Sequence, residues 1–360
     1  MADIVDTHEQ AEQEKRPPLI IRRPLEEYLD SQGLGSGEID AERIGDGHSN
    51  VTYLISRGGE RFVLRRPPRP PLPPSAHDVL REARLLRALE STEVRVPRVL
   101  AACEDESVIG GVPFYVMEYV EGTVMTGAVA PALDSPEERR RISEELIDAL
   151  AEAHAADWRA AGLEGFGKPS GYLDRQLRRF NGLWEHNKTR ELPIVQEVGD
   201  WLAAHKPEQS DATIVHGDYR LGNVMFAHDP PARLVAIFDW ELATIGDPLA
   251  DVGYLTATWS EPNRGDREPT MFDALTVTHG EGFPSRDELV AMYEERSGRS
   301  MTDLRWYQAL ALWKAAVFME GNYKAAVRGD NDDPYLKFFD IGVPQLAEAA
   351  HEVTKMPAPS

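Results

Sequence analysis

Hydrophobic and polar positions alternate in one way before about residue 120 of this chain and in another way after it. In the first part, short apolar runs are separated by glycine-containing turns, and "ERIGDGHSNVTYLISRGGERFVLRR" (42–66) predicts three strands joined by hairpin turns. The run "PFYVMEYVEG" (113–122) predicts a buried strand that continues into a polar, glycine-ended segment. We expect the boundary between two lobes in this segment.

Beyond that boundary, apolar residues recur at the spacing of helices. Six helices are expected there, over residues 136–158, 171–187, 192–205, 285–297, 302–328 and 336–353. Two short apolar runs, 213–215 and 234–238, interrupt the helical pattern and predict strands. The second part is therefore mainly helical, with two strands inside it.

The strand-rich part also contains a helix and an irregular start. "SAHDVLREARLLRALE" (75–90) has apolar residues at helical spacing, with Ser75 or Asp78 as its cap, and it follows a proline-rich connector. The polar, acidic beginning of the chain has no periodicity and predicts a disordered tail. The expected organisation is α+β: a tail (1–22), a small antiparallel-sheet lobe (23–117), a hinge (118–122) and a large helical lobe (123–360).

Composition restricts the partners and the compartment. The net charge is −22, from 39 basic and 61 acidic residues, which argues against nucleic acid or an anionic membrane as a partner. Cys103 is the single cysteine, which rules out an internal disulfide and fits a reducing cytoplasm. The N-terminus has no apolar stretch typical of a secretory signal. We expect a cytoplasmic globular protein; its oligomeric state is left open.

Candidate chemistry is concentrated in the loop "HGDYRLGNVMF" (216–226), directly after the strand 213–215. Asp218 and Asn223 have the spacing D-x-x-x-x-N, and the strand 234–238 ends at Asp239. "NVMF" and "LVAIF" are expected to pair as a hairpin, which brings Asn223 beside Asp239. Two such oxygen ligands suit Mg²⁺, which takes its remaining ligands from phosphates and water. Asp218 is then placed to accept a hydroxyl proton.

The chain resembles the aminoglycoside phosphotransferase family, also called the phosphotransferase enzyme family, in "HGDYRLGNVMF", "AIFDWE" and "GDPLADVGY". In "RLGN" and "VLRRPP" it is especially similar to the kinase-like modules found beside some acyl-CoA dehydrogenase domains. The resemblance covers about residues 23–330. It implies a two-lobed protein-kinase-like fold, with a small antiparallel-sheet N-lobe and a mainly helical C-lobe. The implied reaction transfers the γ-phosphoryl group of ATP, or of GTP, to a hydroxyl group of a small molecule.

By this resemblance Asp218 is the catalytic base, and Asn223 and Asp239 bind Mg²⁺. Arg220 stands where many protein kinases have a lysine that contacts phosphate; the alternative is a solvated arginine in a turn. His216 is expected to brace the loop from beneath rather than to act as a base.

"GDPLAD" predicts the start of a helix that supports this loop. Asp247, followed by Pro248, is the expected N-cap. Asp251 lies in the first turn, where the helix dipole favours a carboxylate, and it can hold the catalytic loop by hydrogen bonds.

The candidate nucleotide loop of the small lobe is "IGDGHSNVTY" (44–53). Gly45 and Gly47 allow close approach of the backbone to phosphates, and Ser49 and Asn50 offer donors. A Gly-x-Gly hairpin turn is common by itself. Its position upstream of the catalytic loop, before the strand "FVLR", supports the assignment.

One feature departs from the protein-kinase pattern, which places a lysine on the strand after the nucleotide loop, paired with a helix glutamate. The small lobe has no lysine after residue 15, so an arginine must replace it. Strand alternation and the analogy with V-A-I-K select Arg65 over Arg66, with Glu82 as its partner. In the hinge, backbone groups of Glu118 and Val120 are expected to read the adenine edge.

The acceptor is expected to bind near residues 255–330, and its identity stays open. An aminoglycoside suits the acidity of residues 260–304, which hold ten acids and five arginines. A hydroxyacyl-CoA thioester suits the similarity to the dehydrogenase-linked modules. A hypothesis of another class is a nucleotide-binding regulator without turnover, which the missing lysine allows.

Overall fold

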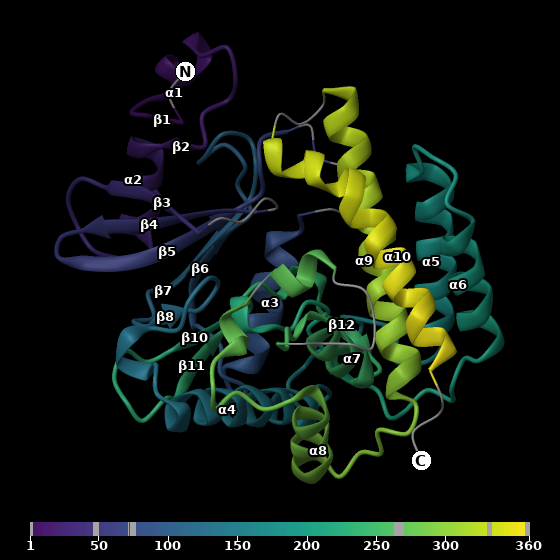
Figure 1. The fold of residues 1–360 in the computed structure, drawn as a ribbon. Coiled ribbons are helices and arrows are strands. Elements are labelled where there is room, and N and C mark those ends of the chain that lie inside the picture. Colours follow the sequence, from purple (N-terminus) through teal and green to yellow (C-terminus); the bar gives the residue numbers. More distant parts are fainter. Residues whose placement is uncertain are drawn as a thin grey trace. The chain divides into compact units, whose positions relative to one another are not determined.

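The computed structural model describes residues 3–45, 50–70, 72, 77–262, 270–274, 276–329 and 333–356, and Figure 1 shows its ribbon. Contacts divide the chain into two compact units. The first comprises residues 1–92 with 96–121, and the second comprises 93–95 with 122–360. The division after residue 121 falls inside the segment 118–122.

The first unit is built on a five-stranded antiparallel sheet in the order β3-β4-β5-β7-β6. Its strands are β3 (Asp40–Ile44), β4 (Val51–Arg57), β5 (Glu60–Arg66), β6 (Val99–Cys103) and β7 (Phe114–Glu118). Gly58 and Gly59 join β4 to β5 with positive φ angles of 57° and 83°, which a tight hairpin turn requires. The hairpin predicted from "RGGE" is therefore present.

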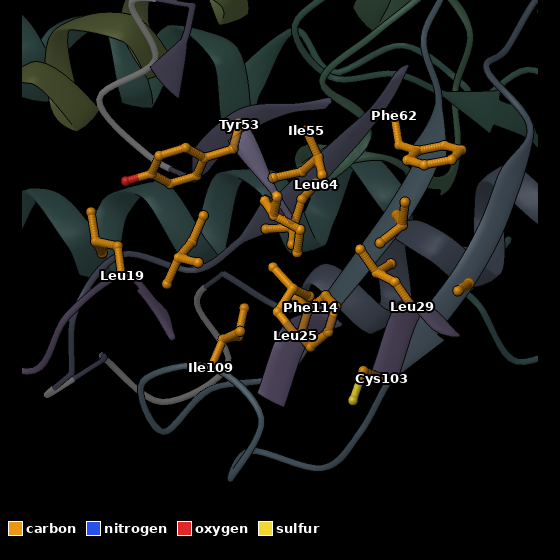
Figure 2. Close-up of a cluster of buried hydrophobic side chains, with 14 of the residues drawn as sticks. Leu19, Leu25, Leu29, Tyr53, Ile55, Phe62, Leu64, Cys103, Ile109 and Phe114 are labelled. Carbon is orange, nitrogen blue, oxygen red and sulfur yellow. The ribbon is translucent and has the colours of Figure 1, made fainter. Parts of the chain in front are cut away.

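One face of this sheet forms the hydrophobic core of the first unit (Figure 2). Tyr53 and Ile55 of β4 and Leu64 of β5 point to the same face, because side chains alternate along a strand. Helix α2 (Arg22–Ser31) contributes Leu25 and Leu29 to this core. The opposite face of β5 carries Val63 and Arg65.

The predicted disorder of residues 1–22 is wrong for the described part of this segment. Its elements are β1 (Ile4–Val5), α1 (His8–Gln13) and β2 (Ile20–Ile21), and β1 pairs with β2 in parallel. Leu19 is buried in the core, and its carbonyl oxygen accepts a hydrogen bond from the fully buried Arg66 guanidinium. The segment is ordered because a few apolar residues and one arginine, 47 residues away in sequence, anchor it.

Helix α3 (Val79–Leu89) begins where the sequence predicts it. The Asp78 carboxylate accepts a hydrogen bond of 2.9 Å from the backbone N–H of Arg81, so Asp78 is the cap; Ser75 lies outside the described residues. The buried face of α3 contains Glu82 among apolar side chains. An acid at a buried position requires a partner.

The second unit is mainly helical, and all six predicted helices are confirmed with boundaries shifted by a few residues. Its helices are α4 (Pro136–Ala155), α5 (Tyr172–Asn187), α6 (Pro193–Ala204), α7 (Leu249–Thr258), α8 (Arg286–Ser297), α9 (Leu304–Arg328) and α10 (Phe339–Lys355). Helix α9 packs against α5, α7 and α10 (Figure 1). Among the described residues, no helix combines the length and apolarity that spanning a bilayer needs.

Two small sheets position the loops of the second unit. Their strands are β8 (Thr123–Val124), β9 (Thr213–Val215), β10 (Val224–Phe226), β11 (Leu234–Ile237) and β12 (Thr244–Gly246). The orders are β11-β10-β8 and β12-β9, all antiparallel. The predicted hairpin of "NVMF" with "LVAIF" is confirmed, with Val224 opposite Ile237. Short 3₁₀ turns complete the unit.

Candidate active site

The loop between β9 and β10 is organised around the Asn223 amide. Its Nδ2 donates to the backbone oxygen of Asp218 at 2.8 Å and to the Asp218 carboxylate at 2.7 Å. Both hydrogen bonds commit the nitrogen, so the amide oxygen Oδ1 points away from Asp218. The D-x-x-x-x-N spacing thus gives an oriented carboxylate and an oriented amide oxygen, supported by the 3₁₀ turn η2 (Leu221–Asn223).

His216 braces the loop and is held in one tautomer. Its Nε2 lies 2.8 Å from the carbonyl oxygen of Phe238, and its Nδ1 lies 3.2 Å from the backbone nitrogen of Asp218. A carbonyl only accepts and a backbone N–H only donates, so Nε2 carries the proton and Nδ1 accepts. Trp240 packs against the ring with centroids 4.6 Å apart. Both nitrogens are used inside the loop, which agrees with a bracing role.

Asp251 holds the start of the loop from below. Its carboxylate accepts hydrogen bonds from the backbone N–H groups of His216 and Gly217 at 2.7 and 2.8 Å. The side chain of His154 lies 3.2 Å away. Burial alone would raise the pKa of the Asp251 carboxyl, but the hydrogen bond from His154, the nearby His216 and the hydrogen bond from the backbone N–H of Gly217 bring that pKa below its ordinary value. The expected bracing by Asp251 is what the geometry shows.

Asp239 follows β11 and lies beside the end of the Asn223 loop. The backbone N–H of Phe238 donates to the carbonyl oxygen of Asn223 at 2.8 Å, which places the two chain segments next to each other. Asp239 itself has φ 62° and ψ 55°, the left-handed region. This conformation costs a non-glycine residue about 1–2 kcal/mol and is concentrated at functional sites.

Asn223 and Asp239 form a donor set that fits a hard cation. They offer an amide oxygen and a carboxylate, and Mg²⁺ is usually held by one or two such protein ligands together with phosphate oxygens and water. Among the described residues there is no group of three or more His, Cys, Asp and Glu that could hold a metal. The pair therefore fits a metal ion that arrives with a phosphate-bearing ligand.

Asp218 is the accessible acid of the loop. Its side chain is 23% exposed, and Arg220 Nε lies 3.6 Å from its carboxylate. A Cβ at Gly222 would come 2.5 Å from the Arg220 guanidinium, the end of a flexible side chain that can shift. Burial raises the pKa of the Tyr254 phenol well above its ordinary value, and the negative charge of Asp218 adds to this. Tyr254 therefore stays a neutral donor close to the Asp218 carboxylate.

The first unit contains the predicted ion pair. Arg65 Nε lies 2.9 Å from the Glu82 carboxylate, and the two side chains are 12% and 2% exposed. Alternation along β5 sends Arg66 to the opposite face, where Nε donates to the Pro67 oxygen at 2.8 Å. Burial lowers the pKa of Arg66 to about 10. Both arginine side chains are thus largely buried, and among the described residues only Arg65 forms an ion pair with an acid.

Next to this ion pair lies the end of the candidate nucleotide loop. Asn50 is buried, and its side-chain oxygen is 3.2 Å from Nδ1 of His77. Burial lowers the pKa of His77, and the positive charge of Arg65 lowers it further. Gly45 has a positive φ of 75°. Gly47 and Ser49 lie outside the described residues.

The hinge residues differ in which backbone groups they offer. The N–H of Glu118 donates to the carbonyl oxygen of Arg98 at 2.9 Å, and the Glu118 carboxylate accepts from the N–H of Arg98 at 2.9 Å. The N–H of Glu118 is therefore committed to the sheet edge. Val120 lies two residues beyond the end of β7.

Sequence reasoning missed His77, His154 and the role of Tyr254. His77 and Asp239 are the non-glycine residues with positive φ in the described part of the chain. No local pattern marks such a conformation in His77, which follows a proline run. Tyr254 is the last residue of the motif "GDPLADVGY". Its position one turn after Asp251 places it on the same face of the helix, which could have indicated its role beside the loop.

The fold and this site define a class: a two-lobed α+β protein of the protein-kinase-like phosphotransferases, with an acid and an asparagine on one loop and a second acid after the next strand but one. The model of the phosphotransferase enzyme family matches residues 40–307. The chain belongs to this family.

Solved structures agree with this assignment. A putative aminoglycoside phosphotransferase from Ralstonia eutropha JMP134 superposes with a TM-score of 0.78 at 32% identity, over 92% of this chain and 97% of that one. A thermostable mutant of aminoglycoside phosphotransferase APH(4)-Ia, in complex with AMP-PNP and hygromycin B, superposes with a TM-score of 0.59 at 16% identity, over 93% and 100% of the chains. The predicted kinase-like fold is confirmed.

Curated relatives carry a different name. Acyl-CoA dehydrogenase family member 10 of Mus musculus is 35% identical over 85% of this chain and 28% of its own length. Acyl-CoA dehydrogenase family member 11 of Homo sapiens is 31% identical over 92% of this chain and 43% of its own length. The chain thus spans less than half the length of these relatives. The predicted similarity to dehydrogenase-linked modules is confirmed.

Proposed function

We propose that this phosphotransferase moves the γ-phosphoryl group of ATP to a hydroxyl group of a small molecule, with Mg²⁺. The observation that supports this most is the hydrogen bonding of Asn223 to Asp218, which leaves a carboxylate facing one way and an amide oxygen facing the other. The proposed base and the proposed metal ligand therefore point in different directions, although they lie within six residues of each other in sequence.

Asp218 is the proposed catalytic base. It accepts the proton of the acceptor hydroxyl late in the transfer, since the transition state of phosphoryl transfer is loose. Asn223 and Tyr254 keep the carboxylate oriented, and Arg220 balances the negative charge that gathers there. This part of the mechanism uses only residues of the second unit.

Asn223 and Asp239 are the proposed Mg²⁺ ligands. When bound, the ion would neutralise charge on the phosphates. The left-handed backbone at Asp239 directs its carboxylate away from the path of β11, and the tie between Phe238 and Asn223 keeps the two ligands on adjacent segments. The strain at Asp239 is tolerated because the hydrogen bond of Phe238 fixes the residue before it and the 3₁₀ turn η3 (Trp240–Leu242) follows it.

The first unit is proposed to hold the nucleotide. Arg65, fixed by Glu82, would contact the α- and β-phosphates, and the glycine loop with Asn50 would cover them. A carbonyl from Glu118 and the N–H of Val120 would read the adenine edge, since the N–H of Glu118 is committed to Arg98. The residues of this loop proposed for phosphate contact are Gly45, Gly47, Ser49 and Asn50.

Two acceptor classes compete. The solved neighbours include an enzyme in complex with hygromycin B, which favours an aminoglycoside. The curated relatives are named as acyl-CoA dehydrogenases, which favours a hydroxyacyl-CoA thioester. A substrate screen should offer both classes with ATP and with GTP, and ADP or GDP release should be measured.

The decisive test compares Asp218→Asn with Asp229→Asn in that screen. Asp229 is an exposed acid in the β10–β11 turn, so its substitution controls for a change of charge. Transfer by the wild type and by the Asp229 variant, with loss in the Asp218 variant, supports the proposal. Nucleotide binding without transfer to any hydroxyl in either class would favour the non-catalytic regulator.

A further inference from the structure

Helices α5 and α9 place two cations on one aromatic ring. Nζ of Lys314 (α9) lies 4.9 Å from the centroid of the Phe180 ring, and the guanidinium carbon of Arg179 lies 5.8 Å from the same centroid. Phe180 is buried, Lys314 is half-buried and Arg179 is exposed. In the part of the chain that the structure describes, neither cation has an ion-pair or hydrogen-bond partner.

The charges around Lys314 are unbalanced. Burial and, to a smaller extent, the charge of Arg179 lower the pKa of Lys314 to about 8, although the charges of Asp251 and Asp218 act in the opposite direction. Asp251 is already occupied by two backbone N–H groups and His154, so it offers Lys314 no direct partner. Asp218 is the accessible acid whose field reaches this ammonium.

Arg190 also lies on an aromatic ring, and it differs from Lys314 and Arg179 because it is paired with acids. The guanidinium of Arg190 lies 4.6 Å from the Tyr323 centroid and is neutralised by Glu320 at 3.1 Å and Asp340 at 2.9 Å. The chain carries 61 acids against 39 basic residues, so acids are abundant. An aromatic platform with two cations, neither of which forms an ion pair with a described acid, is a place where an anion from outside gains the most.

We propose that Lys314 and Arg179 bind a phosphate or carboxylate group of the acceptor substrate whose hydroxyl Asp218 deprotonates. The inference rests on the proposed function and deepens it, because it selects an acceptor that carries negative charge. The Phe180 ring holds the two side chains in place, and the bound anion removes their mutual repulsion. A polycationic acceptor is disfavoured at this position by like charge. The net charge of the chain is therefore a poor guide to its acceptor.

The test measures binding apart from turnover. Isothermal titration calorimetry should be run with free coenzyme A, 3-hydroxybutyrate and kanamycin, on the wild type and on Asp218→Asn. Saturable binding of at least one of the two anions is expected in both proteins, since Asp218 is not part of the anion site. Binding of coenzyme A but not of 3-hydroxybutyrate identifies phosphate as the anion, and binding of 3-hydroxybutyrate but not of coenzyme A identifies carboxylate. Binding of kanamycin alone overturns the inference, and so does binding of none of the three.

Variants then assign the site. Lys314→Gln and Arg179→Gln should each weaken anion binding at least about tenfold, as expected for a lost charged hydrogen bond, and Lys314→Arg should restore most of it. Matched controls are Arg178→Gln, the exposed neighbour on α5, and Lys324→Gln on α9, whose ammonium contacts the His186 carbonyl oxygen. Circular dichroism melting checks that each variant folds. Equal anion affinity in the folded Lys314, Arg179 and control variants overturns the inference.

Failure of this inference and failure of the proposed function look different. If the wild type transfers phosphate to a hydroxyl acceptor and Lys314→Gln leaves the KM for that acceptor unchanged, the anion site is refuted and the kinase activity is supported. If no acceptor is phosphorylated but anion binding depends on Lys314, the anion site is supported and the kinase activity is refuted. A KM effect on the acceptor with an unchanged KM for ATP supports both.

Discussion

The second unit contains two pairs of aspartates, Asp218 with Asp239 and Asp247 with Asp251, and the two pairs have opposite surroundings. Asp247 and Asp251 are fully buried, and each is saturated by donors. Asp247 accepts from the backbone and hydroxyl of Ser210, from the N–H of Leu249 and from the Tyr307 hydroxyl, at 2.8 to 3.1 Å. Asp218 and Asp239 are half-buried and lie on loops. The buried pair builds the framework, and the half-buried pair carries the proposed chemistry.

This difference in burial shows how aspartate can serve either as a structural acceptor or as a group accessible to a ligand. A buried carboxylate is stable only when every lone pair finds a donor, and then it has nothing left to offer a ligand. An acid that reacts must keep part of its carboxylate accessible and depend on neighbours for orientation. Asp218 is oriented by Asn223, and Asp239 has a left-handed backbone, as the proposed roles require. Substitution of a buried aspartate should therefore lower stability, whereas substitution of a half-buried one should lower activity or metal binding.

The largest effect is expected from Asp218→Ala. Loss of a general base should lower kcat about 10²–10⁴-fold, while the KM for ATP should change little because the proposed nucleotide contacts are made by other residues. Steady-state ADP release measures both, and the melting temperature should stay near that of the wild type. A variant with undiminished kcat would refute the role of Asp218, and Asp229→Ala is the matched control.

Asp251→Asn should act on stability instead. Breaking a buried network of charged hydrogen bonds should lower the free energy of unfolding by about 3 kcal/mol or more. Two backbone N–H groups and His154 would lose their anionic partner. Urea unfolding followed by tryptophan fluorescence measures the loss. If stability is retained and only activity falls, the assignment of Asp251 to the framework is wrong.

Asp239→Ala should weaken Mg²⁺-dependent binding of nucleotide at least about 100-fold, since even residues behind a metal ligand contribute 10–100-fold. Titration of Mg²⁺ against a fluorescent ATP analogue measures the effect. An unaltered Mg²⁺ titration would exclude Asp239 as a ligand.

Arg65→Ala should raise the KM for ATP by about tenfold, the size of one lost charge-assisted hydrogen bond. It also leaves Glu82, which is 2% exposed, without this cation. Arg65→Lys should recover part of the affinity, since lysine provides the charge without the planar fork. Arg43→Ala, an exposed arginine of β3, is the control, and an effect of equal size there would remove the specific role of Arg65.

The smallest effect concerns pH. The pKa of Asp251 is lower in the folded protein than its ordinary value of 3.8. Its stabilising contribution is therefore complete above that value and is lost as the pH falls through the folded pKa. The difference in melting temperature between wild type and Asp251→Asn should be constant from pH 7 to 5 and narrow below pH 4. A difference that stays constant down to pH 3 would contradict this, and Asp229→Asn should show no such trend.

The sequence alone determined most of the local structure. The spacing of apolar residues in 136–158 and 302–328 located α4 and α9, and "NVMF" with "LVAIF" predicted the hairpin of β10 and β11, because amphipathic period and turn residues are local properties. The motif around Asp218 was equally local. Its assignment as a base remains a prediction.

Only the tertiary structure decided where isolated side chains find partners. Residues 3–21 are ordered because Arg66, far along the chain, bonds to Leu19, and no local pattern encodes such a contact. The tautomer of His216 follows from a carbonyl 22 residues away. Lys314 and Arg179 are unremarkable in sequence and become a candidate anion site only when α5 and α9 pack around Phe180. Propensity acts over neighbouring residues, whereas burial and charge act through space.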